Sequence, residues 1–222
     1  MRSVFDRELQ DLANDVNDMG TKVDSVLVST IKALKDHDFV LAKTIYENDH
    51  YINAMENNIE RQCFSLIALQ QPIATDLRII TASMKIVTDI ERIGDQCADI
   101  CEIMLTNPNF HAMKTPSLII RMLEKAREMY VGALDAFIQE DAELAKRVAG
   151  TDDQVDEMFS RQVLEIIELL QEEHTRTAEA TDYLFIAKYI ERIADHATNI
   201  AEWAAYQVTG EHKNMNHAAE ED

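Results

Sequence analysis

The chain has 222 residues, of which 46% are hydrophobic and 28% are charged, and this composition excludes wholesale disorder. A formal net charge of −20 repels phosphate backbones and anionic lipid head groups, so direct nucleic-acid binding is not expected. No apolar run approaches the roughly 20 residues that span a bilayer, the amino terminus shows no signal-peptide pattern, and the 3 cysteines are an odd number. We therefore expect a cytoplasmic protein with reduced thiols.

Apolar residues recur at helical spacing along most of the chain, and only 5 Gly and 3 Pro interrupt it. We expect Asp38 to cap the second helix, Pro72 to lie where the third helix starts, and Gly210 to end the last one. In chain order the predicted helices cover residues 3–36, 38–70, a third from about 71 to 106, 118–139, 141–172 and 175–209.

The second half of the chain repeats the first. The segment 36–53 aligns with 139–156, so that Asp49 corresponds to Asp152, 103 positions later (152 − 49). The segment 90–102 aligns without a gap with 190–202, and both begin Ile-Glu-Arg-Ile. Two matches in the same order indicate an internal duplication.

This duplication defines the predicted fold class, an all-α protein of two tandem, homologous three-helix bundles. The predicted first bundle covers residues 1–108 and the second covers 118–210, with a proline-containing linker at 109–117. Residues 211–222 are polar and acidic, and we expect a disordered tail there.

Carboxylates form one stripe on the third helix of each copy. On a helical wheel, Glu91, Asp95, Asp99 and Glu102 lie within roughly 80° of one another, opposite the isoleucines that would face the core. Glu191, Asp195, Asn199 and Glu202 repeat the stripe in the second copy. Stacked like charges destabilise a helix, whereas several oxygens on one face suit a hard cation.

The preceding helix of each copy adds oxygen ligands at a spacing of four residues. These are Asp49 with Asn53, and Asp152 with Asp156, and the second pair is placed to meet Glu191 and Asp195 across the bundle. Asn53 and Asn199 each replace an acid, and an amide oxygen carries no charge to offset a metal. We therefore expect two related metal sites of unequal strength.

Other interpretations have weaker support. A solvated acidic face, or a scaffold that docks a basic partner without metal, remains the main alternative. A ferritin-like di-iron site needs a Glu-x-x-His on two helices, and only Glu47 with His50 fits. No phosphate-binding glycine loop or His-x-x-x-His zinc motif occurs, so we expect no enzymatic activity, and a metal-dependent hydrolase is a minor alternative.

At these residues the sequence resembles the PhoU family of accessory regulators of phosphate uptake. The resemblance covers about residues 3–210 and depends on LQQPIATDLRII (69–80), DIERIGDQCADI (89–100), YIERIADHATNI (189–200) and the Asp49 and Asp152 segments. It implies two three-helix bundles, a homodimer, and metal held by Glu/Asp-x-x-x-Asp motifs, with iron or zinc expected and magnesium or manganese as alternatives. The motif residues are Glu91, Asp95 and Asp99, Glu191 and Asp195, and Asp152 and Asp156.

The resemblance also implies partners and a role. Such proteins couple the ATPase subunit of a phosphate ABC transporter to a sensor histidine kinase, and so contact the membrane only through partners. They repress phosphate-starvation genes and restrain uptake when phosphate is plentiful. On this basis the expected function is that of a metal-binding negative regulator.

Overall fold

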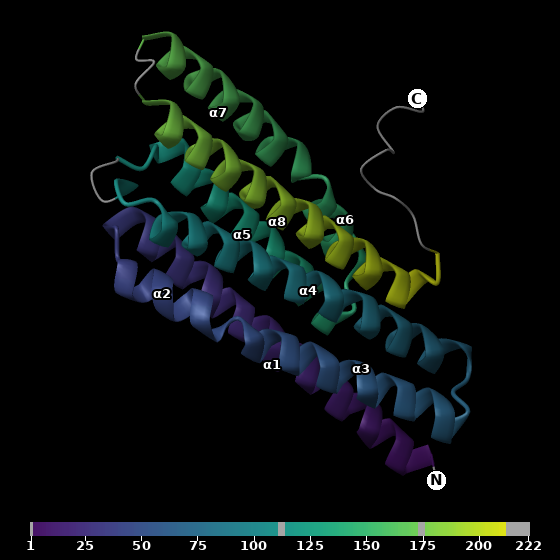
Figure 1. Ribbon diagram of the computed structural model, residues 1–222. Coiled ribbons are helices and arrows are strands. Elements are labelled where there is room, and N and C mark those ends of the chain that lie inside the picture. The colour runs from purple at the N-terminus through teal and green to yellow at the C-terminus, as the bar shows by residue number, and fades with distance from the viewer. Residues whose placement is uncertain (1, 111–113, 173–175, 212–222) are drawn as a thin grey trace, which may run out of the picture.

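The computed structural model describes residues 2–110, 114–172 and 176–211 (Figure 1). Over these residues the chain folds into α-helices joined by short connections and contains no strand, which confirms the predicted fold class. The first repeat contains α1 (Arg2–Asp36), α2 (Phe39–Asn48), α3 (His50–Gln70) and α4 (Ala74–Thr106). The second contains α5 (Ser117–Gln139), α6 (Ala142–Ala149), α7 (Asp152–Glu172) and α8 (Thr177–Thr209).

Several helix ends lie where the sequence predicts them. The Asp38 side chain accepts a hydrogen bond from the Leu41 backbone N–H at 2.9 Å, and so caps α2. Gly210, with φ of 74°, ends α8 in the left-handed conformation that glycine adopts without strain. The helix after Pro72 begins slightly later than predicted, at Ala74, because Gln71 is left-handed and Ile73 is extended.

The predicted single helices 38–70 and 141–172 were wrong, because each is broken into two. The first is interrupted at Asp49 and the second at Gly150 and Thr151. In both copies a side chain near the break donates a hydrogen bond to a backbone carbonyl oxygen. His50 Nδ1 donates to Glu47 O at 2.9 Å, and Thr151 Oγ1 donates to Val148 O at 2.6 Å. Such local bonds compete with regular helix hydrogen bonding.

The two repeats meet along α4 and α8, which lie side by side and antiparallel in the centre of the molecule (Figure 1). At one end of this contact, Asn107 of the α4 C-cap donates a hydrogen bond to Asp182 of α8. At the other end, the Arg78 guanidinium of α4 lies directly against Gly210. We call this contact the α4–α8 seam.

The hydrophobic core is continuous across the seam, so the two bundles share one interior. The isoleucines that the sequence places on the buried side are fully buried, as predicted: Ile86, Ile90, Ile93 and Ile100 in α4, and Ile186, Ile190, Ile193 and Ile200 in α8. A second contact joins α1 to α5, where Arg127 pairs with both carboxylate oxygens of Asp24 at 2.6 and 3.0 Å.

Part of the predicted linker 109–117 belongs to the core. Phe110 is fully buried, and its ring lies 5.9 Å from that of Tyr183 and 6.4 Å from that of Phe39. Residues 111–113 of this linker, and nearly all of the predicted tail, lie outside the described residues. Of the helices that are described, none has a stretch both long and apolar enough to span a membrane.

A shared core predicts that the two repeats unfold together. Ile90→Ala and Ile190→Ala each remove a fully buried side chain at the seam, and each should lower the free energy of unfolding by about 2–5 kcal/mol. Urea unfolding followed by circular dichroism and by fluorescence of Trp203, the single tryptophan, should show one coincident transition for each variant. Two transitions, with only one shifted by each substitution, would contradict a shared core.

Candidate metal-binding site

Carboxylates of the first repeat gather where α3 begins and crosses α4. Asp49 precedes the first residue of α3, Glu56 lies two turns further along, and Glu91, Asp95 and Asp99 follow one edge of α4. We call these five residues the first acidic cluster. Their ordering depends on the helix period, because positions separated by four residues stack on the same face.

An open hollow of about 510 Å³ lies over part of the first acidic cluster. Its lining includes Asp49, Asp95 and Asp99, together with Glu102, whose carboxylate accepts a hydrogen bond from Tyr46 Oη at 3.2 Å. Burial raises the pKa of Asp49, and the carboxylates of Asp95 and Asp99 raise it further. The hollow is therefore a region where like charges are held close together.

Glu91 is the most deeply buried member of the first acidic cluster, with 8% of its surface exposed. Burial raises its pKa to about 7, and the nearby carboxylates of Asp95, Glu56 and Asp49 add to this shift. Arg92 acts in the opposite direction, since its guanidinium lies 3.5 Å from Glu91 and 3.1 Å from Asp95. Arg92 therefore pairs with both carboxylates along this edge of α4.

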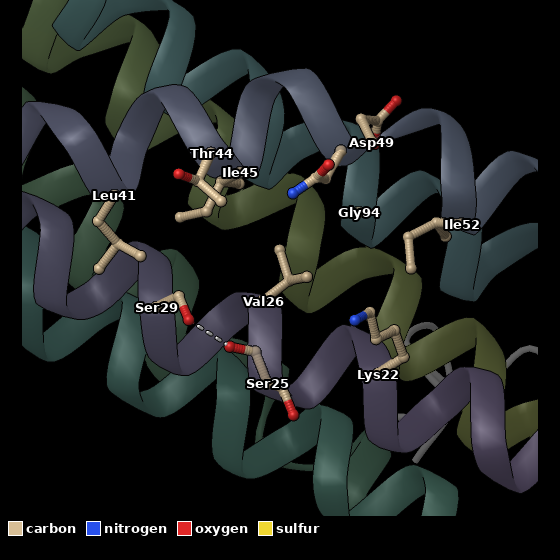
Figure 2. Close-up of a pocket in the computed structure, with 11 residues that line it drawn as sticks. Lys22, Ser25, Val26, Ser29, Leu41, Thr44, Ile45, Asp49, Ile52 and Gly94 are labelled. Carbon is tan, nitrogen blue, oxygen red and sulfur yellow. Dashed lines mark hydrogen bonds between the residues drawn. The ribbon is translucent and has the colours of Figure 1, made fainter.

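A cavity of about 170 Å³ lies on the other side of Asp49, between α1, α2 and α4 (Figure 2). Lys22 and Val26 of α1 face Ile45, Asp49 and Ile52 across it. Gly94 of α4 closes one wall, where a Cβ would lie 3.4 Å from Ile52 and 3.8 Å from Asp49. The helix break therefore places Asp49 in the wall between this cavity and the acidic hollow.

The second repeat brings together Asp152 and Asp156 of α7 with Glu191 and Asp195 of α8. We call these four residues the second acidic cluster. Burial raises the pKa of Asp152 to about 6, and the carboxylates of Asp195 and Asp156 contribute to this rise. Burial also raises the pKa of Asp156, and the Glu191 carboxylate adds to the shift. The predicted approach of these two pairs across the bundle is confirmed.

Lys188 lies within the second acidic cluster. Its ammonium pairs with the Glu191 carboxylate, one helical turn away on α8, and lies 5.5 Å from the centre of the Phe159 ring of α7. Burial and Glu191 raise the pKa of Asp195, and the Lys188 ammonium opposes that rise. It opposes the rise at Asp156 in the same way.

Two asparagines predicted as ligands have different surroundings. Asn199 directs its amide to the α4–α8 seam, where Nδ2 donates to Asp89 Oδ1 at 3.2 Å. The same Asp89 oxygen lies 2.8 Å from His196 Nδ1. Asn53, in contrast, has a side-chain oxygen that is buried and accepts no hydrogen bond from the described residues.

The sequence interpretation missed Glu56 and Lys188. The signal for Glu56 was available, because residues 49, 53 and 56 share one helix face. Lys188 also had a signal, since it precedes Glu191 by three residues on the edge that carries the acids. As the side chains are placed, no group of three or more His, Cys, Asp or Glu within the described residues has a metal-holding arrangement.

The fold and site define a class of protein: a duplicated helical bundle with an acidic cluster on each copy. The family model described as PhoU domain matches residues 16–104 and again 119–204, one match in each repeat. The chain belongs to the PhoU family.

Similar proteins match over nearly the whole chain. One relative, the phosphate-specific transport system accessory protein PhoU homolog of Clostridium acetobutylicum, is 34% identical over 218 residues, which cover 97% of this chain and 99% of the relative. The crystal structure of the phosphate transport system regulatory protein PhoU from Streptococcus pneumoniae superposes with a TM-score of 0.88 at 31% identity, covering 95% of this chain and 99% of that one. PhoU from Pseudomonas aeruginosa gives a TM-score of 0.88 at 33% identity, covering 93% and 100%.

The raised pKa of Glu91 predicts a pH-dependent stability in chelated buffer. A glutamate in an unfolded chain has a pKa of about 4.3, so the folded protein holds this proton more tightly. Stability should therefore fall as the pH rises from about 4 to 7, with no further loss from this group above 7. Glu91→Gln removes the buried charge, and should raise the free energy of unfolding by about 2 kcal/mol at pH 8.

The gain from Glu91→Gln should be much smaller at pH 5, where the native carboxyl is already protonated. Urea titrations at the two pH values measure this difference. Glu128→Gln is the matched control, because that side chain is 70% exposed beside Lys125 and should show little change at either pH. An equal gain at both pH values would contradict the assignment of the raised pKa to Glu91.

Proposed function

We propose that this protein is an accessory regulator of a phosphate transport system, acting as a metal-binding adaptor without turnover. Membership of the PhoU family supports the accessory role, since the relatives carry that name. The observation that carries the metal part is the pair of acidic clusters, where carboxylates are held close together at equivalent places in both repeats. Its proposed action is to restrain phosphate uptake and the starvation response.

The donor set of the first acidic cluster fits a hard cation. All of its ligands are oxygens, which divalent metals such as Mn²⁺ or Fe²⁺ accept. Glu91 Oε2 of the cluster is buried and accepts no hydrogen bond from the part of the chain that the structure describes, and the same is true of Asn53 Oδ1, which lies one turn after Asp49 but is not a carboxylate of the cluster. The guanidinium of Arg92 lies 3.5 Å from this Glu91 oxygen. Carboxylate rotation would be needed to bring three ligands together.

A bound cation would neutralise the repulsion within the cluster and link α3 to α4. Asp49 lies at the break between α2 and α3, so it connects the cluster to the orientation of both helices. Iron or zinc, with manganese or magnesium as alternatives, would occupy this place. The residues of this chain supply the oxygens and fix the angle between the helices, and no catalytic step is assigned to them.

The proposed partners are the ATPase subunit of a phosphate ABC transporter and a sensor histidine kinase. Support comes from the relatives, which are named as accessory proteins of that transport system. A net charge of −20 favours a basic docking surface on the partner. The protein itself is proposed to act as a homodimer in the cytoplasm.

Metal content tests the metal part of this function. Gently purified protein should carry metal, and Glu91→Ala/Glu191→Ala should lose most of it, because one carboxylate is removed from each cluster. Elemental analysis of both proteins gives the comparison. Glu128→Ala/Glu165→Ala removes two carboxylates of exposed surface pairs and should retain its metal. Equal metal in all three proteins would contradict metal binding at the clusters.

A pull-down with the ATPase subunit tests the adaptor part. The immobilised protein should retain the subunit at low salt, and a chelator should weaken retention if metal shapes the docking surface. Retention that is lost in high salt but unaffected by chelator would favour the alternative, a metal-independent scaffold that docks a basic partner. No retention under any of these conditions would contradict the adaptor role.

A further inference from the structure

The two acidic clusters differ at the residue in the middle of the stripe. With about 100° between successive residues, and Glu91 set at 0°, Asp95 lies at about 40°, position 88 at about 60° and Asp99 at about 80°. Position 88 is therefore inside the arc of carboxylates. It is Thr88 in the first repeat and Lys188 in the second.

Lys188 makes the contacts expected of a cation held in this position. Its ammonium pairs with Glu191 on its own helix and faces Phe159 of α7 at 5.5 Å. The Lys188 charge opposes the rise in the pKa of both Asp156 and Asp195. The ammonium, on a side chain that is 51% exposed, thus lies at the edge where α7 and α8 bring the second acidic cluster together.

The first repeat has neither a lysine nor an aromatic ring at the positions that correspond to Lys188 and Phe159. Thr88 contributes no charge: its hydroxyl donates to Met84 O at 3.2 Å and also interacts with the Glu56 carboxylate, which lowers the pKa of Glu56. At the position of Phe159, 103 residues earlier (159 − 56), stands Glu56, a further carboxylate whose pKa burial raises. The first acidic cluster has therefore gained an oxygen ligand where the second has an apolar ring.

The arginine that follows the glutamate in both repeats does not supply the first acidic cluster with a cation equivalent to Lys188. Arg92 and Arg192 lie at about 100° on the same wheel, outside the arc of carboxylates. Arg92 pairs with Glu91 and Asp95 from that edge. Arg192 acts across the seam, where its charge opposes the raised pKa of Asp99. Of these three cations, Lys188 alone lies inside the arc of carboxylates.

We infer that Lys188 is a tethered cation that replaces a metal ion in the second acidic cluster, so that a divalent metal binds only at the first. This inference depends on the metal-binding part of the proposed function and refines it. Two ions of like charge repel strongly at contact distance, and the ammonium already satisfies Glu191. The second acidic cluster would then hold α7 to α8 at all metal concentrations, whereas the first would respond to metal.

Titration of chelator-stripped protein with Mn²⁺ tests the assignment, with calorimetry and the loss of the free-ion paramagnetic resonance signal as readouts. Glu91→Ala should abolish tight Mn²⁺ binding, and Glu191→Ala should leave it unchanged. Lys188→Met keeps a side chain of similar length against Phe159 but removes the charge, and it should add Mn²⁺ binding that persists in Lys188→Met/Glu91→Ala. Lys188→Arg keeps the charge and should add none.

The reciprocal change tests the first acidic cluster. Thr88→Lys should remove tight Mn²⁺ binding, whereas Thr88→Met, its uncharged control of similar length, should retain it. Circular dichroism and urea midpoints of each pair establish that both members are folded. Equal losses from Glu91→Ala and Glu191→Ala, or no gain from Lys188→Met, would overturn the inference and leave metal binding intact. No Mn²⁺ binding by any of these proteins would overturn the proposed metal function as well.

Discussion

The α4–α8 seam is the interaction on which the rest of the structure depends. Each helix buries a row of isoleucines on one side, and burial of each such side chain contributes about 1.5–3 kcal/mol. This apolar contact fixes both helices, so the carboxylates on their outer edges are held in place despite their mutual repulsion. The helices α3 and α7, which contribute to the two acidic clusters, lie on opposite sides of the α4 and α8 pair (Figure 1).

The helix breaks complete each cluster. Asp49 immediately precedes α3, and Asp152 is the first residue of α7. A carboxylate at a helix amino terminus is stabilised by the unpaired backbone N–H groups there. For both residues this benefit is outweighed by burial and by the facing carboxylates, since both pKa values are raised. The breaks therefore place the Asp49 and Asp152 carboxylates close to other carboxylates, an arrangement that a cation would stabilise.

Duplication has preserved the backbone of the two sites while their charges have diverged. Asn53, Glu56 and Thr88 of the first repeat correspond to Asp156, Phe159 and Lys188 of the second. Each exchange changes a charge or removes an oxygen ligand, yet the helices around the clusters remain alike. The consequence is a molecule with one cluster that contains a lysine and another that retains several neighbouring carboxylates beside Arg92.

The sequence by itself determined the helical class, the duplication, the buried rows of isoleucine and the two Glu-x-x-x-Asp motifs. These depend on periodicity and on local propensity, which are properties of short segments. The breaks at Asp49 and Gly150 were not predicted, although Asn48, Asp49, Gly150 and Thr151 are weak helix formers. Apolar residues recur at helical spacing on both sides of each break, and the local bonds made by His50 and Thr151 are visible only in the structure.

Only the tertiary structure decided which side chains share a cluster. Asn199 repeats the position of Asp99 in the sequence, but its amide turns to Asp89 because α4 lies beside it. The sequence does not distinguish Lys188 from other surface lysines. The position of α7 brings Phe159 and Asp156 close to its ammonium. Contacts between helices depend on packing, and the packing of α3 on α4 and of α7 on α8 set the charge environment of most predicted ligands.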